Sequence, residues 1–186
     1  MSRLEVHPVT AERWPDLVEL FEQRGPRGGH RNVPAYGCWC MYRRDRALKH
    51  GTPKKRAMGM LVRAGREPGL LAYRDGQPVG WVSVAPREDF GALLRSPQYR
   101  PSDEDEGVWS IVCFTIDKPV RREGLAGALL EAAVAHACRR GASAVEGYAH
   151  VSDPRDYMGS RDLFLAHGFT PVRDANKRVV VRRECP

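Results

Sequence analysis

The sequence predicts one α/β domain with a mixed β-sheet, and three stretches carry that prediction. Two β-rich runs, GLLAYR and QPVGWVSV, flank Asp75-Gly76, a dipeptide that favours a tight hairpin turn. The segment VWSIVCFTI at 108–116 is almost wholly apolar, which is typical of a central strand covered on both faces. An Ala- and Leu-rich helix over 124–140 then leads to a strand over 144–151, which completes a strand–helix–strand unit.

The segments before this core predict two helices. TAERWPDLVELFEQRG carries one apolar stripe, with Thr10 as its N-cap. GTPKKRAMGMLVRAG has Thr52 as N-cap, Pro53 in the first helical position and Gly65 as its stop. Between them, AYGCWCMYRR at 35–44 fits either a strand or a buried turn.

The segments after the hairpin complete the domain. A polar, turn-rich excursion over 86–107 precedes the apolar strand. GSRDLFLAHGF at 159–169 predicts a short helix that ends at Gly168, and RVVVRRE at 178–184 predicts a closing strand. The predicted order is two helices, two strands, and then strand–helix–strand–helix–strand within 1–186.

Length and composition limit the class of protein. The 186 residues suit a single domain, and a net charge of +7 favours an anionic partner such as nucleic acid, a membrane or a phosphorylated cofactor. The N-terminus lacks the apolar core of a secretory signal and no apolar run is long enough to span a membrane, so a cytoplasmic protein is expected. The five cysteines suggest no disulfide framework, and Cys138 is expected to pack as a small hydrophobe.

The stretch RREGLAGALL at 121–130 is the most informative motif. It places Arg121, Arg122 and Gly124 between the apolar strand and its helix. A helix N-terminus presents free N–H groups and a partial positive charge, and glycine lets a ligand approach the backbone closely. The stretch therefore predicts an anion-binding loop suited to a pyrophosphate, although it is neither a dinucleotide fingerprint nor a P-loop. A glycine turn with solvated arginines is the alternative.

Arg121-x-x-Gly124-x-Ala126 resembles the R/Q-x-x-G-x-G/A loop of the GNAT superfamily of acyl-CoA N-acyltransferases. The order of elements over 70–170 extends the resemblance, as does FLAHGF, which looks like that superfamily's Y-x-x-x-G-F segment. The resemblance implies a GNAT-like fold, with a mixed central sheet that is splayed at the cofactor strand and with helices on both faces. It divides the single domain into acceptor-side helices, an acyl-CoA-binding core and a C-terminal strand, over 1–67, 68–170 and 171–186.

The resemblance also implies acetyl-CoA as the co-substrate and names the residues that would hold it. The pantetheine arm is expected in the splayed gap, beside the strand end formed by Phe114, Thr115 and Ile116. Phe164, at the tyrosine position of Y-x-x-x-G-F, is expected beside the cofactor. The pyrophosphate is expected on the loop amides of Arg121, Arg122, Glu123, Gly124, Leu125, Ala126 and Gly127.

Transfer of the acetyl group to an amine by direct attack requires groups that move protons and stabilise the oxyanion. The family's usual acid is replaced by Phe164, and the glutamate base of some members by Ser110, which can orient a water. Tyr157 is the substitute acid, and Glu146 is the substitute base with His150 as the second choice. For Tyr157, the alternative role is packing, and for Glu146 and His150 it is that of ordinary surface groups.

Two other functions stay open. The segment 43–66 is dense in Arg and Lys, which suits a nucleic-acid-binding module as an alternative to an enzyme, although such runs are usually solvated helix faces. The missing acid and base leave a CoA-binding sensor without catalysis as a third function. Cys38-x-Cys40, near His30 and His50, suggests a metal site, but its spacing fits packing in the core or a substrate pocket better, so no metal is expected.

The acceptor is an amine on a small molecule or a protein, and the sequence identifies it no further. A cationic amine is expected, because the acidic run at 103–106 precedes the cofactor strand and would attract cations over about 8–10 Å. A solvated loop is the alternative. No membrane partner is expected, nucleic acid is disfavoured, and a homodimer is left open.

Overall fold

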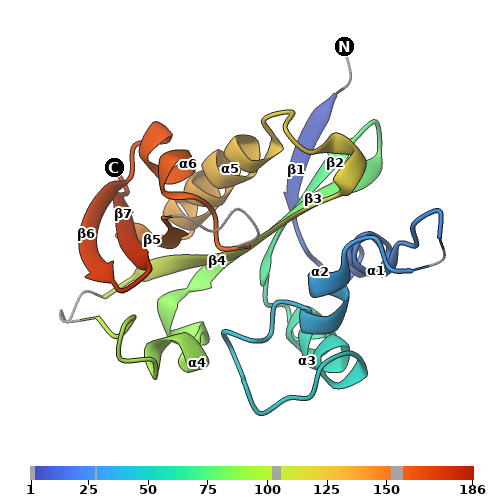
Figure 1. Cartoon of the computed structure of the whole chain (residues 1–186), viewed down its shortest axis with the longest axis horizontal. Coiled ribbons are helices and arrows are strands. Elements are labelled where there is room, and N and C mark those ends of the chain that lie inside the picture. The colour runs from blue at the N-terminus through green and yellow to red at the C-terminus, as the bar shows by residue number, and fades with distance from the viewer. Residues whose placement is uncertain (1–2, 28, 102–105, 152–156) are drawn as a thin grey trace.

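In the computed structural model, which describes residues 3–27, 29–101, 106–151 and 157–186, helices cover both faces of an open seven-stranded sheet (Figure 1). The strand order is β1-β2-β3-β4-β5-β7-β6. Among the described strands, only β4 and β5 are parallel neighbours, so the sheet is mixed, as predicted. The strands are β1 Leu4–Pro8, β2 Gly69–Arg74, β3 Gln77–Pro86, β4 Val108–Ile116, β5 Ala144–His150, β6 Thr170–Ala175 and β7 Arg178–Glu184.

The helices divide the core into two faces. Helix α5 packs on one face with α6, over a cluster that includes Leu129, Ala133 and Phe164. Helices α1, α2, α3 and α4 cover the other face (Figure 1). The bounds are α1 Trp14–Glu22, α2 Val33–Cys38, α3 Thr52–Arg63, α4 Gly91–Leu94, α5 Leu125–Arg139 and α6 Arg161–Ala166, with 3₁₀ turns η1 Arg87–Asp89 and η2 Lys118–Val120.

The predicted hairpin, apolar strand and central helix are confirmed. Asp75 and Gly76 join β2 to β3 with φ of 49° and 79°, the left-handed pair that an Asp-Gly hairpin turn requires. The apolar strand and the Ala-rich helix are β4 and α5, within two residues of their predicted bounds. These elements were predictable because short-range turn chemistry and apolar periodicity both specify them.

The N-terminal third differs from its prediction at the starts of both helices. Helix α1 begins at Trp14, so Thr10 does not cap it. Helix α3 begins at Thr52 itself, and Gly51 takes the N-cap position. Of the two alternatives for 35–44, the buried turn is confirmed: α2 ends at Cys38, and the buried Trp39 and Cys40 then turn the chain with φ of 48° and 49°. Strands β1 and β6 were not anticipated, because edge strands lack a full apolar alternation.

The expectation that Cys138 packs as a free thiol is wrong, because this cysteine is in a disulfide bond. Cys138 near the end of α5 forms a disulfide with Cys185, just beyond β7, with the two Cα atoms 5.5 Å apart. The two residues are 47 positions apart, and no local pattern in the sequence indicates the pairing. Cys38, Cys40 and Cys113 are free. In the part of the chain that the structure describes, no helix is both long and apolar enough to cross a membrane.

We expect Cys185→Ser to lower the free energy of unfolding by about 2–4 kcal/mol under oxidising conditions, because the cross-link restricts the unfolded chain. Urea denaturation of the variant and of the wild type measures the loss. Wild type treated with dithiothreitol is the matched control and is expected to unfold at the midpoint of the variant. Equal midpoints for the untreated wild type and the variant would show that the cross-link contributes nothing.

Candidate active site

Strands β4 and β5 separate before they end, and another segment enters the gap. They pair in parallel only along Val108–Ile111 and Ala144–Gly147. Farther along, the Phe114 N–H donates to the Tyr157 carbonyl oxygen at 2.6 Å. On the opposite side of the gap, the His150 N–H donates to the Gly159 carbonyl oxygen at 3.0 Å. The splay is therefore present, and this segment already uses one amide of each strand.

The loop before α5 has the backbone shape of an anion site. Arg122 and Gly124 both have left-handed φ, at 68° and 79°, which turns successive amides in different directions. A left-handed arginine is unusual, since only glycine adopts that region without strain. A Cβ on Gly124 would meet no atom within 4 Å, so the loop opens to free space there. This open side, with α5 behind it, is suited to a phosphate.

A groove of about 640 Å³ joins this loop to the splayed strands. Its walls bring together Phe114 and Ile116 of β4, Arg121 and Arg122 of the loop, and Tyr157, and the rest of its lining comprises Ala126, His150, Gly159, Ser160 and Leu163. Arg121 also donates from Nε to the Ile116 carbonyl oxygen at 3.0 Å, which ties the loop to the end of the strand. The groove thus brings together five residues that were predicted to hold the donor and Tyr157, the predicted acid.

Three of the predicted loop residues also have structural roles at their side-chain positions, and the expected role of their backbone amides stays a prediction. The Glu123 carboxylate pairs with Arg74 of β2. The Leu125 side chain is buried in the core. Gly127 lacks a side chain for a packing reason, because a Cβ there would lie 2.6 Å from His167 Nε2. These positions shape the loop, whereas Arg121, Arg122 and Ala126 face the groove.

Phe164 lies in the core rather than on the groove. It is fully buried and packs edge-on against Phe114 and Phe169, with ring centres 6.2 and 5.0 Å away. A Cβ on Gly147 would lie only 2.4 Å from the Phe164 ring. A residue with no exposed surface cannot contact a ligand, so the expectation of Phe164 beside the cofactor is not supported, and Leu163 lines the groove in its place.

We expect Phe164→Tyr to leave the rate of any acetyl transfer within about threefold of wild type and to lower stability by about 1–3 kcal/mol, because the added hydroxyl overfills a packed site. Thermal unfolding and turnover of the purified variant measure the two effects. Phe169→Tyr is the matched control, since that ring is equally buried and packs against Phe164. Rates that rise at least tenfold in Phe164→Tyr alone would indicate that position 164 does reach the leaving group.

Tyr157 stands where the groove meets two further pockets. It is 37% exposed, and burial of the rest of the ring raises the pKa of its phenol. One neighbouring pocket, which we call the polar pocket, measures about 250 Å³ and is lined by Arg31, Asn32, Ala35, Thr115, Lys118, Arg121 and Tyr157. Thr115 Oγ1 and Asn32 Oδ1 are buried there without a hydrogen-bond partner among the described residues. Such orphaned oxygens are suited to hold a water or a ligand.

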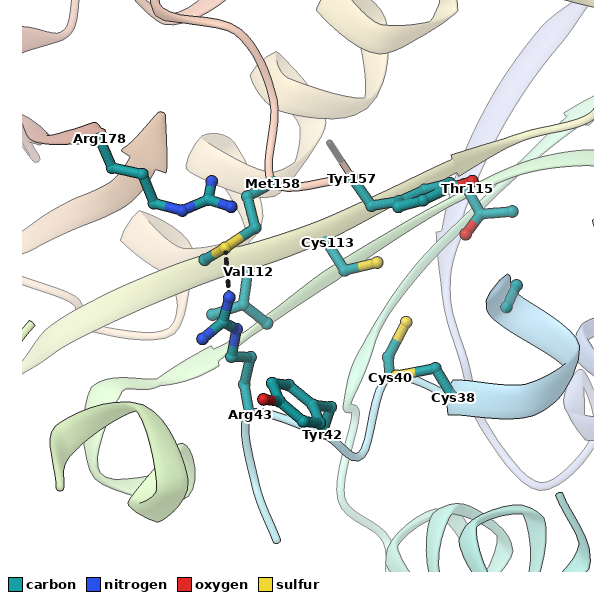
Figure 2. Close-up of a pocket in the computed structure, with 11 residues that line it drawn as sticks. Cys38, Cys40, Tyr42, Arg43, Val112, Cys113, Thr115, Tyr157, Met158 and Arg178 are labelled. Carbon is teal, nitrogen blue, oxygen red and sulfur yellow. Dashed lines mark hydrogen bonds between the residues drawn. The ribbon is translucent and has the colours of Figure 1, made fainter. Parts of the chain in front are cut away.

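The other neighbouring pocket, which we call the thiol pocket, measures about 260 Å³ and lies between α2, β4 and β7. Figure 2 shows Arg43 and Arg178 on either side of Met158 at one end, and Tyr157 with Thr115 at the other. Ala35, Cys38, Cys40, Tyr42, Val112 and Cys113 form the remaining lining. No signal in the sequence indicates that Arg43 and Arg178, which are more than a hundred positions apart, line the same pocket.

The thiols of Cys38 and Cys40 suit packing rather than catalysis. Hydrogen bonding to Cys113 and burial together raise the pKa of Cys40 well above its usual value, and burial raises the pKa of Cys38. Trp81 donates from Nε1 to Cys40 Sγ at 3.2 Å. Protonated thiols are poor nucleophiles. Across the described ranges, no three His, Cys, Asp or Glu side chains are placed to hold a metal ion.

Glu146 and Ser110 do not reach the groove. The Glu146 carboxylate is buried and accepts from Arg182 Nη2 at 2.9 Å and from Arg87 Nη1 at 3.5 Å. Ser110 Oγ shares a hydrogen bond of 2.9 Å with Tyr148 Oη. These groups form a buried network beneath the paired part of β4 and β5. His150, the second base candidate, does line the groove.

The basic segment at 43–66 does not form one solvated face. Arg44 is buried and pairs with Asp89 at 3.2 Å. Lys55 pairs with Glu22 at 2.6 Å. These two cations therefore have acidic partners within the fold, whereas Arg46, Lys49, Arg56 and Arg63 of the same segment are exposed.

The acidic run at 103–106 lies mostly outside the described residues, which exclude 102–105. Glu106, the described member, accepts from Ser143 Oγ at its backbone oxygen, at 2.7 Å. It precedes the first residue of β4, whereas the groove lies at the last residues of that strand. Glu106 thus lies near the end of β4 that is farther from the groove.

The chain is an α/β protein with an open mixed sheet, in which β4 and β5 separate beside the loop that precedes α5. The sequence profile of the Acetyltransferase (GNAT) family matches residues 15–169, and the chain therefore belongs to that family. No match was found among curated protein sequences.

Solved structures share the whole fold. The acetyltransferase of the GNAT family from Streptococcus pneumoniae is 14% identical, with a TM-score of 0.61 over 99% of this chain and 100% of that one. PaiA N-acetyltransferase from Thermoplasma acidophilum, in complex with coenzyme A, is 11% identical, with a TM-score of 0.56 over 98% and 99%. An aminoglycoside acetyltransferase in complex with coenzyme A is 12% identical, with a TM-score of 0.60 over 98% and 95%. At such identities the likeness establishes the fold alone.

Proposed function

We propose that this protein transfers an acetyl group from acetyl-CoA to an amine by direct attack. The observation that carries the proposal is the position of Tyr157, which lines the groove beside the anion loop and both pockets beside α2. A donor in the groove and an acceptor in either pocket would meet at this side chain. Membership of the GNAT family and the CoA complexes of two structural neighbours support the choice of donor.

The groove fits the donor in size and charge. The open side of Gly124 and the guanidinium groups of Arg121 and Arg122 suit the pyrophosphate. The apolar side chains of Phe114 and Ile116 suit the pantetheine arm. Because the Phe114 amide is bound to the Tyr157 carbonyl, the arm takes the outer part of the gap or displaces that contact.

The reaction forms a bond from the amine nitrogen to the acetyl carbon and breaks the carbon–sulfur bond. The departing thiolate takes a proton from the Tyr157 phenol, whose raised pKa keeps it protonated at neutral pH. The proton lost by the amine goes to a water in the polar pocket, held by the orphaned oxygens of Thr115 and Asn32. Of the described residues, none that lines the groove or either pocket is a carboxylate, so water is the acceptor we favour over Glu146.

A release assay for free thiol tests the proposal. Purified protein with acetyl-CoA and a panel of amines is expected to release CoA faster with at least one amine than without any, together with an acetylated product by mass spectrometry. A protein that binds CoA but acetylates no amine would be a sensor, the alternative that the missing acid and base left open. A protein that binds neither CoA nor acetyl-CoA would refute the function altogether.

A further inference from the structure

Two buried oxygen atoms of the polar pocket lack a hydrogen-bond partner among the described residues. They are Oδ1 of Asn32, a residue that is 2% exposed, and Oγ1 of Thr115, which is 3% exposed. Both residues line the pocket. Because a buried polar atom without a partner costs free energy, we expect each of these oxygens to be satisfied by a molecule that enters the pocket.

The orientation of the Asn32 amide is fixed by a hydrogen bond to the protein. Its Nδ2 donates to the Leu20 carbonyl oxygen of α1 at 2.8 Å. Only the amide nitrogen can donate to a carbonyl oxygen, so Oδ1 is the atom that is left without a partner, and it can only accept. The group that satisfies Asn32 is therefore a hydrogen-bond donor.

The Thr115 side chain lies on the opposite face of β4 from the donor groove. Successive side chains of a strand point to opposite faces. Phe114 and Ile116 line the groove, whereas Thr115 lines the two pockets beside α2. Tyr157, which lies at the same end of the thiol pocket as Thr115, lines all three spaces (Figure 2). A ligand held by Thr115 thus lies close to the reacting end of a donor in the groove.

The two oxygens can accept more hydrogen bonds than the water of the proposed reaction supplies. An amide oxygen and a hydroxyl oxygen each have two lone pairs, whereas one water donates at most two hydrogens. Half of the accepting capacity therefore remains for N–H groups of the acceptor. A primary amine brings two N–H groups and a secondary amine brings one.

The walls of the polar pocket disfavour an ammonium ion. Of the described residues that line it, none is a carboxylate, whereas Arg31, Lys118 and Arg121 are cationic. Arg31 pairs with Asp117 at 2.9 Å, but this carboxylate is not part of the lining. Positive charges nearby favour the neutral form of an amine, which is the form that direct attack requires. The pocket is therefore suited to recognise N–H groups rather than a positive charge.

We propose that Asn32 and Thr115 bind the nitrogen of the acceptor in the polar pocket and select a primary amine, whose two N–H groups meet the two buried oxygens. This inference rests on the proposed function and names the residues that determine the acceptor at the same site. N-methylation removes one N–H group and leaves one buried oxygen unsatisfied, which weakens binding. Recognition by N–H groups replaces the attraction of a cationic acceptor that the acidic run at 103–106 led us to expect.

The test compares primary amines with their N-methyl analogues. Benzylamine, ethanolamine, glycinamide and the best amine of the thiol-release panel are each assayed beside the N-methyl compound, with acetyl-CoA as donor. For the best acceptor, we expect kcat/KM of the primary amine to exceed that of its N-methyl analogue by about tenfold or more. Equal or better use of the methylated amine would overturn the inference.

Thr115→Val assigns this preference to the hydroxyl, because valine keeps the branching at Cβ and removes the hydrogen-bonding group. We expect the preference for the primary amine to fall to about twofold or less, since one of the two accepting oxygens is gone. A steric conflict between the N-methyl group and position 115 would persist in the variant, and loss of a bound water would slow both amines equally. An unchanged preference would therefore overturn the assignment. Stability is not expected to fall, because Thr115 Oγ1 has no hydrogen bond to lose.

Thr10→Val is the matched control. Thr10 Oγ1 is likewise buried without a partner among the described residues, but Thr10 lines neither the groove nor either pocket. The same replacement there is expected to leave the preference unchanged, and an equal loss in the two variants would contradict the role of Thr115. Asn32→Ala removes the other oxygen together with the hydrogen bond to Leu20, and the same loss of preference is expected there. Unchanged CoA affinity shows that each variant is folded.

Binding without turnover separates this inference from the proposed function. The same amine pairs are titrated by calorimetry into the complex of the protein with CoA, which carries no acetyl group. Tighter binding of the primary amine that is lost in Thr115→Val, in a protein that acetylates no amine, would retain the amine site and refute the enzyme. Acetylation without preference for the primary amine would retain the enzyme and refute the site. A protein that neither binds nor acetylates any of these amines would refute both.

Discussion

Gly124→Glu is expected to weaken the binding of CoA by at least about 10²-fold while the protein stays folded. Position 124 has φ of 79°, which a non-glycine residue adopts at a cost of about 1–2 kcal/mol. The larger effect is electrostatic, because a carboxylate at the mouth of the loop repels the phosphates that Arg121 and Arg122 attract. Since a Cβ there meets no atom within 4 Å, the fold is not disturbed by contact. Calorimetry with CoA measures the loss.

Gly141 offers the matched control at the other end of α5. It follows the helix with φ of 84°, and a Cβ there would also meet nothing within 4 Å. Gly141→Glu therefore carries the same backbone strain far from the groove and is expected to bind CoA as the wild type does. Gly124→Ala separates strain from charge and is expected to retain most of the affinity. CoA affinity that is equal in Gly124→Glu and Gly141→Glu would remove the loop from the binding site.

Tyr157→Phe is expected to lower kcat by roughly 10²-fold or more, the usual contribution of one proton donor. The phenol is the donor in its neutral form, and burial raises its pKa above the ordinary value near 10. The phenol of Tyr157 therefore stays protonated throughout pH 7–9. Deprotonation of this phenol is expected to lower the wild-type rate only above that range. Turnover against pH for both proteins measures the effect.

CoA affinity in Tyr157→Phe is expected to stay within about threefold of wild type, because the ring and its backbone contact to Phe114 remain. Tyr36→Phe is the control: Tyr36 stacks on His30 with ring centres 3.5 Å apart and lines neither the groove nor the two pockets. An unchanged kcat in Tyr157→Phe would assign that residue to packing and leave protonation of the thiolate to water.

The sequence by itself determined the elements whose signals are local. The Asp75-Gly76 turn, the apolar run of β4 and the periodicity of α5 each lie within a single window, so hairpin, strand and helix were predicted close to their bounds. Because the loop that contains Arg121, Arg122 and Gly124 lies between β4 and α5, its position in the fold could be predicted from these two elements. Tyr157 was predicted as the acid from its place in the loop before the helix that begins at Arg161, and its role stays a prediction.

Only the tertiary structure decided which side chains share a site. Glu146 lies on the predicted strand, yet pairing of β5 with β7 and the approach of η1 place Arg182 and Arg87 beside it and remove it from the groove. Arg43 and Arg178 line one pocket although more than a hundred positions separate them, and Cys138 likewise pairs with the distant Cys185. Such contacts depend on how strands and helices pack, and local periodicity and turn chemistry carry no information about them.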